Sequence, residues 1–250
     1  MRTSNVCMSE ANNYRLERWI AAILFLLFFL PFVANADEIL FTDLFHGDQI
    51  KAKSGQSYLA LVCNEDNDRC VLQPVTIQVT PEYHPIVDAE HERTGKRISA
   101  PGLEMVYLLR SAHLAPGPVT SARPSFTELL PVSKPQPITL GATKYVLHYR
   151  CTSAPDPDGF VDCMLVLDGN GLTQVLATFP ALDADGKLSS LDVEQYVVFA
   201  GDLDRDGKLD LLANIASRWN EWRPALYLSK AAREGELVGK VVEWLVDVGC

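Results

Sequence analysis

The segment "FAGDLDRDGKLDLLANI", residues 199–215, places four aspartates within nine residues, between two apolar runs. They are Asp202, Asp204, Asp206 and Asp210. Two carboxylates about 4 Å apart repel each other by roughly 4 kcal/mol at an effective dielectric constant near 20. If the four side chains share one loop, something must offset that repulsion, and a bound cation is the simplest candidate.

The spacing of the acids has the order of ligands found in calcium-binding loops. Counted from Asp202, the aspartates occupy positions 1, 3, 5 and 9, Gly207 occupies position 6 and Lys208 position 7. In such loops the acidic side chains converge on the ion, the carbonyl at position 7 adds a ligand, and glycine permits the sharp turn. Anionic oxygen ligands suit Ca²⁺ and not the metals that prefer thiolate or imidazole. The predicted ligands are Asp202, Asp204, Asp206, the carbonyl of Lys208, and Asp210.

The flanks of the loop distinguish an EF-hand from a β-hairpin. An EF-hand needs a bidentate glutamate at position 12 and a helix on each side. Position 12 is Ala213, and the flanking runs "YVVFA" and "LDLLANI" are typical of strands. We therefore expect a hairpin that is EF-hand-like only in its first ligands. The alternative is an acidic hairpin tip in which water solvates the aspartates and glycine makes the turn.

The stretch "AGDLDRDGKLDLL" followed by "ALYLS" resembles one repeat of the FG-GAP/VCBS family, over about residues 196–230. The resemblance implies a hairpin of a β-propeller blade whose D-x-D-x-D-G-x-x-D loop binds calcium through the five ligands named above. A second stretch, "ALDADGKLSS", keeps Asp183 and Asp185 but has Ala181 where the first ligand belongs. Because a closed propeller needs at least four blades, we expect one blade-like unit and not a complete propeller.

Strand signals dominate the rest of the chain. Short runs rich in leucine, β-branched and aromatic residues recur between clusters of Gly, Pro, Asn and Asp, as in "SYLALVC", "KYVLHYRC" and "CMLVLDG". They predict a mainly β protein of antiparallel hairpins and meanders, in which Asn170-Gly171 marks a tight turn. Helical patterns are confined to "EILFTDLF" (38–45) and "SKAAREGEL" (229–237), and the second also fits a hairpin tip.

The N-terminus and a proline-rich stretch suggest how the chain is divided. Arg15 and Arg18 precede the apolar run "WIAAILFLLFFLPFV", and residues 34–36, "ANA", match a signal-peptidase site. We predict a signal peptide at 1–36, with an uncleaved membrane anchor as the alternative. Prolines in 115–137 argue against a regular ladder there and predict a linker or long crossover. It would separate an N-terminal β segment, 37–114, from a C-terminal β segment, 138–250, that carries the aspartate loop.

Cysteine spacing indicates export. Cys63 and Cys70 bracket "NEDNDR", and Cys151 and Cys163 bracket a second polar stretch, so each pair is predicted to staple a hairpin. Such pairs are typical of an oxidising compartment. The expected location is therefore periplasmic or secreted. Cys250 has no obvious disulfide partner. Its thiol is free, exchanges with one of the two predicted disulfides, or forms a disulfide with a second chain.

The net charge and the absence of known catalytic motifs exclude several classes of function. The formal net charge is −10 and no basic cluster is present, which argues against nucleic acid and anionic lipid as partners. The chain lacks a nucleophile elbow, a phosphate loop and a dinucleotide fingerprint. In "YHPIVDAEHE" (83–92), His84 and His91 lack the spacing of a zinc protease, and we expect a solvated loop. Trp219 and Trp222 either pack beside the aspartate loop or contact a sugar or peptide.

Together these observations predict an exported calcium-binding β protein that acts as a structural or interaction module of the cell envelope or the secreted fraction. Its partners would be Ca²⁺ and an extracellular protein or glycan, with a membrane only if the leader stays attached. We expect it not to be an enzyme. The alternative is a small secreted hydrolase with a structural calcium site, whose cleft would bring a histidine together with carboxylates.

Overall fold

The structure is a computed structural model that describes residues 36–64, 66, 68–122, 134–153, 160–180, 197–216, 221–244 and 246–247. The described residues belong to one compact unit, Ala36–Cys250. The predicted signal peptide, apart from Ala36, lies outside the described residues, as do Asp183, Asp185, Trp219 and Cys250. Within the described ranges, no helix is long and apolar enough to cross a membrane.

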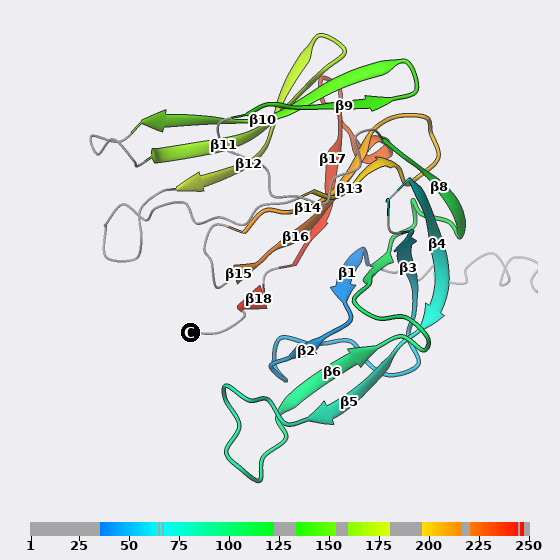
Figure 1. Cartoon of the computed structure of the whole chain (residues 1–250), viewed down its shortest axis with the longest axis vertical. Helices are drawn as coiled ribbons and strands as arrows, with labels where there is room; N and C mark the ends of the chain where they lie inside the picture. Colours follow the sequence, from blue (N-terminus) through cyan, green and yellow to red (C-terminus); the bar gives the residue numbers. More distant parts are fainter. Residues whose placement is uncertain are drawn as a thin grey trace, which may run out of the picture. The chain divides into compact units, whose positions relative to one another are not determined.

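The described chain is antiparallel β structure, as the sequence predicts (Figure 1). In the first half the strands are β1 (Glu38–Phe41), β2 (Leu44–Phe45), β3 (Ser57–Cys63), β4 (Arg69–Thr76), β5 (Gln78–Glu82), β6 (Gly95–Ser99), β7 (Tyr107–Arg110) and β8 (Gly117–Ser121). In the second half they are β9 (Gln136–Leu140), β10 (Thr143–Ser153), β11 (Phe160–Gly169), β12 (Leu172–Pro180), β13 (Val197–Asp202), β14 (Asp210–Asn214), β15 (Glu221–Trp222), β16 (Pro224–Leu228), β17 (Gly239–Glu243) and β18 (Val246–Asp247). A 3-10 turn, η2 (Ser229–Ala231), follows β16.

A nine-stranded sheet forms the main body, in the order β1-β7-β3-β4-β8-β13-β14-β16-β17. Its first five strands come from the N-terminal half of the chain and its last four from the C-terminal half. Strand β1 at one end contacts β16 and β17 at the other. One core therefore lies inside the curved sheet, where Leu72 and Leu109 pack in the same cluster as Leu212 and Leu226. The sheet is nearly closed and barrel-like, so the prediction that the chain is not a complete propeller is confirmed.

A four-stranded sheet, β12-β11-β10-β9, provides a second core. Its inward residues pack with residues of β13, β14 and β16 that point away from the first core, such as Leu211 and Tyr227. The Tyr227 hydroxyl donates a hydrogen bond to the carbonyl of Leu176 in β12 at 3.0 Å. Strands β14 and β16 are thus buried on both faces, which explains why "DLLAN" and "PALYL" are nearly continuous apolar runs without polar alternation.

The N-terminal half also contains a three-stranded sheet, β2-β6-β5. In the same half of the chain, one prediction of secondary structure is wrong. Residues 38–45, which we expected to be helical, form β1 and β2 instead. Strand β1 pairs with β7 from Glu38–Arg110 to Phe41–Tyr107, and this ladder buries Ile39 and Leu40. An eight-residue segment is too short to be a stable helix by itself, so the strand pairing decides its conformation.

The predicted hairpin turn and the two predicted disulfides are present in the structure. Asn170 and Gly171 both have positive φ, 50° and 76°, and they link Gly169 to its partner Leu172 in a two-residue hairpin. Both predicted disulfides are present, Cys63–Cys70 and Cys151–Cys163, and each joins residues directly opposite one another on neighbouring strands. Two such bonds indicate an oxidising, extracytoplasmic compartment.

The proline-rich stretch differs from expectation over part of its length. Residues 117–121 form β8, which pairs with β4 on one side and β13 on the other. A regular ladder therefore does exist within 115–137, despite Pro118. Pro118 is paired with Val71 of β4, whereas the partners of β8 in β13 are Thr120 and Ser121. The proline is thus accommodated outside the ladder with β13, and 123–133 lies outside the described residues.

Candidate metal centre

The aspartate loop is the tip of a β-hairpin. Strand β13 ends at Asp202 and β14 begins at Asp210, and the two strands pair antiparallel through Gly201–Asp210. The backbone turns at Arg205 and Gly207, which have φ values of 61° and 82°. Because strands flank the loop on both sides, the choice of a hairpin over an EF-hand is confirmed.

Three carboxylates converge at this tip. Asp202, Asp204 and Asp210 each place a carboxylate oxygen within 4.8 Å of the others. Asp210 is fully buried, and Asp204 and Asp202 are 5% and 9% exposed. Three acids this close and this little solvated form a group that could hold a metal ion.

The Asp210 carboxylate accepts hydrogen bonds from three backbone N–H groups. Its Oδ2 accepts the backbone N–H groups of Leu203 and Asp204 at 2.7 and 3.0 Å, and its Oδ1 accepts that of Ser229 at 2.7 Å. Burial raises the pKa of Asp210 to about 7, and the charge of Asp204 adds to the rise, whereas the N–H donors oppose it. The carboxylate is therefore held firmly in place, but its negative charge is poorly compensated within the protein.

Asp202 and Asp204 organise the turn. Asp202 accepts the N–H of Asp206 on Oδ1 at 3.0 Å and the N–H of Gly207 on Oδ2 at 2.9 Å. Asp204 Oδ1 also accepts from Asp206, at 3.2 Å. These bonds draw the loop around the two carboxylates. A carboxylate oxygen has two lone-pair sites, so an oxygen that accepts an N–H can still bind an ion.

The two other predicted ligands lie differently. The Asp206 carboxylate is not part of the group of three; its Oδ1 accepts the N–H of Lys208 at 2.9 Å and its Oδ2 lies 3.9 Å from Lys208 Nζ. The Lys208 side chain is largely exposed. Ligation by Asp206 and by the Lys208 carbonyl remains a prediction.

Two residues outside the loop complete the site, and the loop motif does not include them. Ser229 supplies the N–H to Asp210, and Lys230 places its Nζ 3.6 Å from Asp204 Oδ1 and donates its N–H to Oδ2 at 3.2 Å. Both belong to η2, which follows β16, and β16 pairs with β14. Their contribution depends on this strand pairing, and the repeat resemblance over 196–230 includes both residues but assigns them no role.

The histidine-containing segment 83–92 is only partly a solvated loop. His84 is 7% exposed, and its ring stacks on that of His46 with centroids 4.2 Å apart. Asp88 accepts the N–H groups of His84 and Thr94 at 2.8 and 2.9 Å. This buried anchor fixes the loop between β5 and β6.

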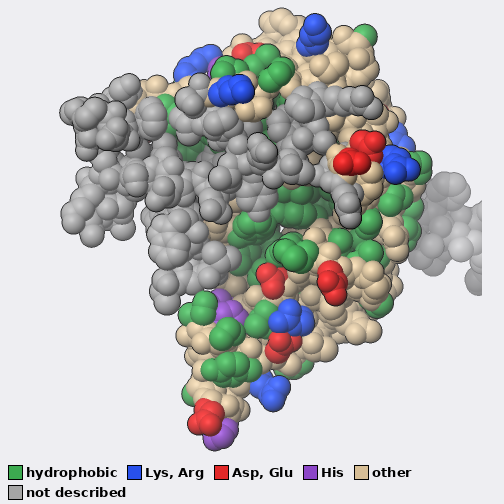
Figure 2. All heavy atoms as spheres, in the orientation of Figure 1, with side chains coloured by type: hydrophobic (Ala, Val, Ile, Leu, Met, Phe, Trp, Pro, Cys, Tyr) green, Lys and Arg blue, Asp and Glu red, His purple; other side chains and the backbone are tan. Residues whose placement is uncertain are grey.

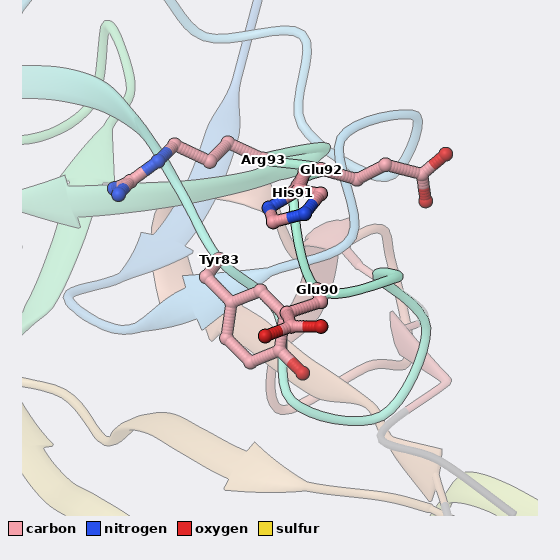
Figure 3. A pocket seen from close by; sticks show the side chains of 5 residues that line it. All are labelled: Tyr83, Glu90, His91, Glu92 and Arg93. Carbon is pink, nitrogen blue, oxygen red and sulfur yellow. The ribbon is translucent and has the colours of Figure 1, made fainter.

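The same loop borders a cavity of about 560 Å³ (Figure 3). Its lining residues are Tyr83, Glu90, His91, Glu92 and Arg93. Figure 3 shows the Glu92 and Arg93 side chains extending in opposite directions from the loop. Among the described residues, no hydrogen bond or ion pair joins His91 to a carboxylate, and Glu92 instead accepts the N–H of Ala89 at 3.0 Å.

Trp222 packs within the protein. Its ring lies 5.8 Å from that of Phe41 and 6.4 Å from that of Tyr107, measured between centroids. These contacts favour packing over ligand binding for Trp222. They also connect the segment after β14 to β1 and β7.

The drawn surface carries charges of both signs (Figure 2). On the face drawn in Figure 2, Lys and Arg side chains and Asp and Glu side chains are both scattered over the surface. No cluster of basic residues is visible there among the coloured side chains.

Comparison with known proteins adds no assignment. No family model matches the chain, and neither the curated proteins nor the solved structures contain a significant match. The features that bear on function are therefore the all-β fold with its disulfides and the acidic cluster at the β13–β14 hairpin.

Proposed function

We propose that this is an exported calcium-binding β protein in which Ca²⁺ stabilises the 202–210 hairpin loop, built like one FG-GAP/VCBS repeat. It would serve in the periplasm or the secreted fraction as a structural or interaction module, with an extracellular protein or glycan as its ligand. The observation that carries the proposal is the buried convergence of Asp202, Asp204 and Asp210.

Charge balance supports a dication. Three carboxylates face one ammonium group, that of Lys230, so the cluster keeps an excess of negative charge that a divalent ion would neutralise. All the side-chain donors are hard oxygens, which favours Ca²⁺ or Mg²⁺ over softer metals. Ca²⁺ accepts irregular coordination by six to eight oxygens, which suits a loop with carboxylate and carbonyl ligands better than the strict octahedron of Mg²⁺. Asp206 and the Lys208 carbonyl would complete the shell.

The expected affinity fits an exported protein. Calcium sites of extracellular modules have dissociation constants of about 10⁻⁴–10⁻³ M. At ten times that concentration, binding adds about 1.4 kcal/mol to the free energy of unfolding. For a protein of this size, such a gain raises the melting temperature by about 3–6 °C.

The test is a melting curve in Ca²⁺ and in EDTA, with a calcium titration by calorimetry. Asp204→Ala should abolish the calcium-dependent rise, whereas Asp48→Ala, at an exposed aspartate remote in sequence, should keep it. Equal melting temperatures for the wild-type protein in Ca²⁺ and in EDTA would refute the proposal.

A secreted hydrolase is the second candidate, and the cavity lined by Glu90, His91 and Glu92 favours it. It predicts turnover that His91→Ala removes while calcium binding stays intact. Absence of hydrolysis across ester, peptide and glycoside substrates at neutral pH would leave the binding module as the better account.

A further inference from the structure

Within the described residues, the ladder that joins the two halves of the nine-stranded sheet, the β8–β13 joint, is short. In the part of the chain that the structure describes, strand β8 pairs with β13 through Gly201–Ser121 and Asp202–Thr120. One further bond extends it, from the N–H of Ala122 to the carbonyl of Ala200 at 2.7 Å. By comparison, β3 and β4 pair over seven residues, from Ser57–Thr76 to Cys63–Cys70. Over the described residues, the β8–β13 joint is therefore much shorter than the β3–β4 ladder.

The acidic cluster lies at this joint. Asp202 belongs both to the three converging carboxylates and to the β8–β13 ladder. Next to it, the strands approach so closely that a Cβ on Gly201 would lie 2.1 Å from the carbonyl oxygen of Thr120. A change in the position of Asp202 would therefore displace β8 as well.

Arg205 makes a second link between the loop and β8. It lies between Asp204 and Asp206 with a left-handed φ of 61°, and its side chain is directed to the segment that begins β8. Its Nε donates to the carbonyl of Pro118 at 3.1 Å, and its guanidinium also donates to that of Ala115 at 3.0 Å. The absence of a side chain at Gly117 leaves room, because a Cβ there would lie 3.0 Å from the guanidinium.

The guanidinium is used for this link and not to neutralise the acids. Within the described part of the chain, no ion pair joins Arg205 to an aspartate of the cluster, whereas Lys230 does approach Asp204. A cation at the loop tip that turns away from three nearby carboxylates indicates a positioning role. The fork of N–H donors suits two carbonyls at once.

We infer that Arg205 is a positioning residue of the calcium loop, through which occupation of the loop tightens the joint between β8 and β13. The inference rests on the proposed calcium site and assigns that site a regulatory role. A bound ion fixes Asp202 and Asp204, and with them the backbone that carries Arg205. The ordered guanidinium then holds the carbonyls of Ala115 and Pro118, and both halves of the sheet stay docked. Because such coupling is reciprocal, loosening the Arg205 contacts lowers the affinity for the ion.

The Ala122 amide is the reporter, because its hydrogen bond crosses the joint. The experiment measures its exchange rate by NMR in the full chain, in excess Ca²⁺ and in EDTA, together with the calcium dissociation constant. With Ca²⁺ at ten times its dissociation constant, exchange at Ala122 should slow by about tenfold in the wild-type protein. Amides of the β3–β4 ladder should change less.

Arg205→Ala should remove most of this calcium dependence at Ala122 and weaken calcium binding by about fivefold. Arg205→Lys should restore part of both effects, because an ammonium can donate to one of the carbonyls. The matched control is Arg69→Ala: Arg69 pairs with Thr120 across β4–β8, but its side chain is 84% exposed, so both readouts should stay unchanged.

The outcomes separate the inference from the proposed function. If the wild-type protein does not bind Ca²⁺, both fail. If it binds Ca²⁺ and Ala122 responds equally in wild type and Arg205→Ala, the calcium site stands and the role of Arg205 is refuted. If Arg205→Ala does not fold, Arg205→Asn replaces it, since asparagine tolerates positive φ and its short side chain forgoes the clamp; an unchanged response in that variant refutes the inference in the same way.

Discussion

Nζ of Lys230 lies 3.6 Å from Oδ1 of Asp204, and the backbone N–H of the same lysine donates to Oδ2 of that aspartate at 3.2 Å. A residue from the turn after β16 thus partly compensates the charge of the hairpin loop. Its ammonium would also repel a cation bound between the carboxylates.

Replacement of Lys230 by glutamine should therefore tighten calcium binding. At 4 Å, two unit charges interact by about 1 kcal/mol in water, so an ammonium group and a divalent ion interact by about 2 kcal/mol, which corresponds to roughly a thirtyfold change in the dissociation constant. Calorimetric titration measures it. Lys144→Gln, at an exposed lysine on β10, is the control and should leave the affinity unchanged. Weaker binding in Lys230→Gln would mean that the lysine chiefly supports the loop.

Gly201→Ala should destabilise the protein through the β8–β13 joint. The added Cβ would lie 2.1 Å from the Thr120 carbonyl oxygen, a backbone atom that can move only if the ladder opens. Overpacking of this kind costs about 1–3 kcal/mol, and we expect the upper end. Denaturant unfolding measures it, and because Gly201 does not have a positive φ, the loss reports the overlap and not backbone strain. A loss well below about 1 kcal/mol would contradict the tight approach.

Each disulfide should contribute about 2–3 kcal/mol to the free energy of unfolding. The bonded cysteines are 7 and 12 residues apart, and closing loops of this length removes that much chain entropy from the unfolded state. The double variants Cys63→Ser/Cys70→Ser and Cys151→Ser/Cys163→Ser, compared by denaturant unfolding, should therefore lose similar amounts. A far larger loss in one of them would show that its bond also holds non-local structure.

The loop between β5 and β6 should open in acid. Burial acts to raise the pKa of Asp88, but hydrogen bonds from the Thr94 side chain and from the N–H groups of His84, Thr94 and Gly95 prevail and hold it at about 2. An unfolded aspartate has a pKa near 3.9. The stabilisation is therefore fully present above about pH 4 and is lost as the pH falls through 2. Exchange of the Thr94 amide between pH 5 and 2 measures this.

Asp88→Asn should exchange faster at Thr94 and with no added pH dependence, whereas Asp48→Asn should behave as the wild type. An acid transition that persists in Asp88→Asn would assign it to another group.

Local sequence signals predicted those features that local chemistry determines. The Asn170-Gly171 turn, the two cysteine pairs and the strands on both sides of the aspartate loop follow from residues next to one another. The positive φ of Gly207 follows likewise from its position in the loop motif. These features need no knowledge of which distant strands meet.

The features that we did not predict from the sequence depend on pairing between segments far apart in the chain. Residues 38–45 look helical by themselves, but Ile39 and Leu40 are buried by pairing with β7. Pro118 argues against a ladder, yet β8 lies between β4 and β13. The roles of Lys230 and Arg205 at the acidic cluster arise because β16 and β8 are neighbours of the hairpin. The aspartate-loop motif by itself encodes neither contact, although the repeat resemblance over 196–230 includes Lys230.

The ends of the sheets have a consequence for solubility. Strand β9, at one end of the four-stranded sheet, contains Pro137, and β5, at one end of the three-stranded sheet, contains Pro81. A proline interrupts the row of N–H donors that a strand of another molecule would need. Intermolecular sheet extension, the usual first step of amyloid growth, is thus obstructed at the β9 and β5 edges.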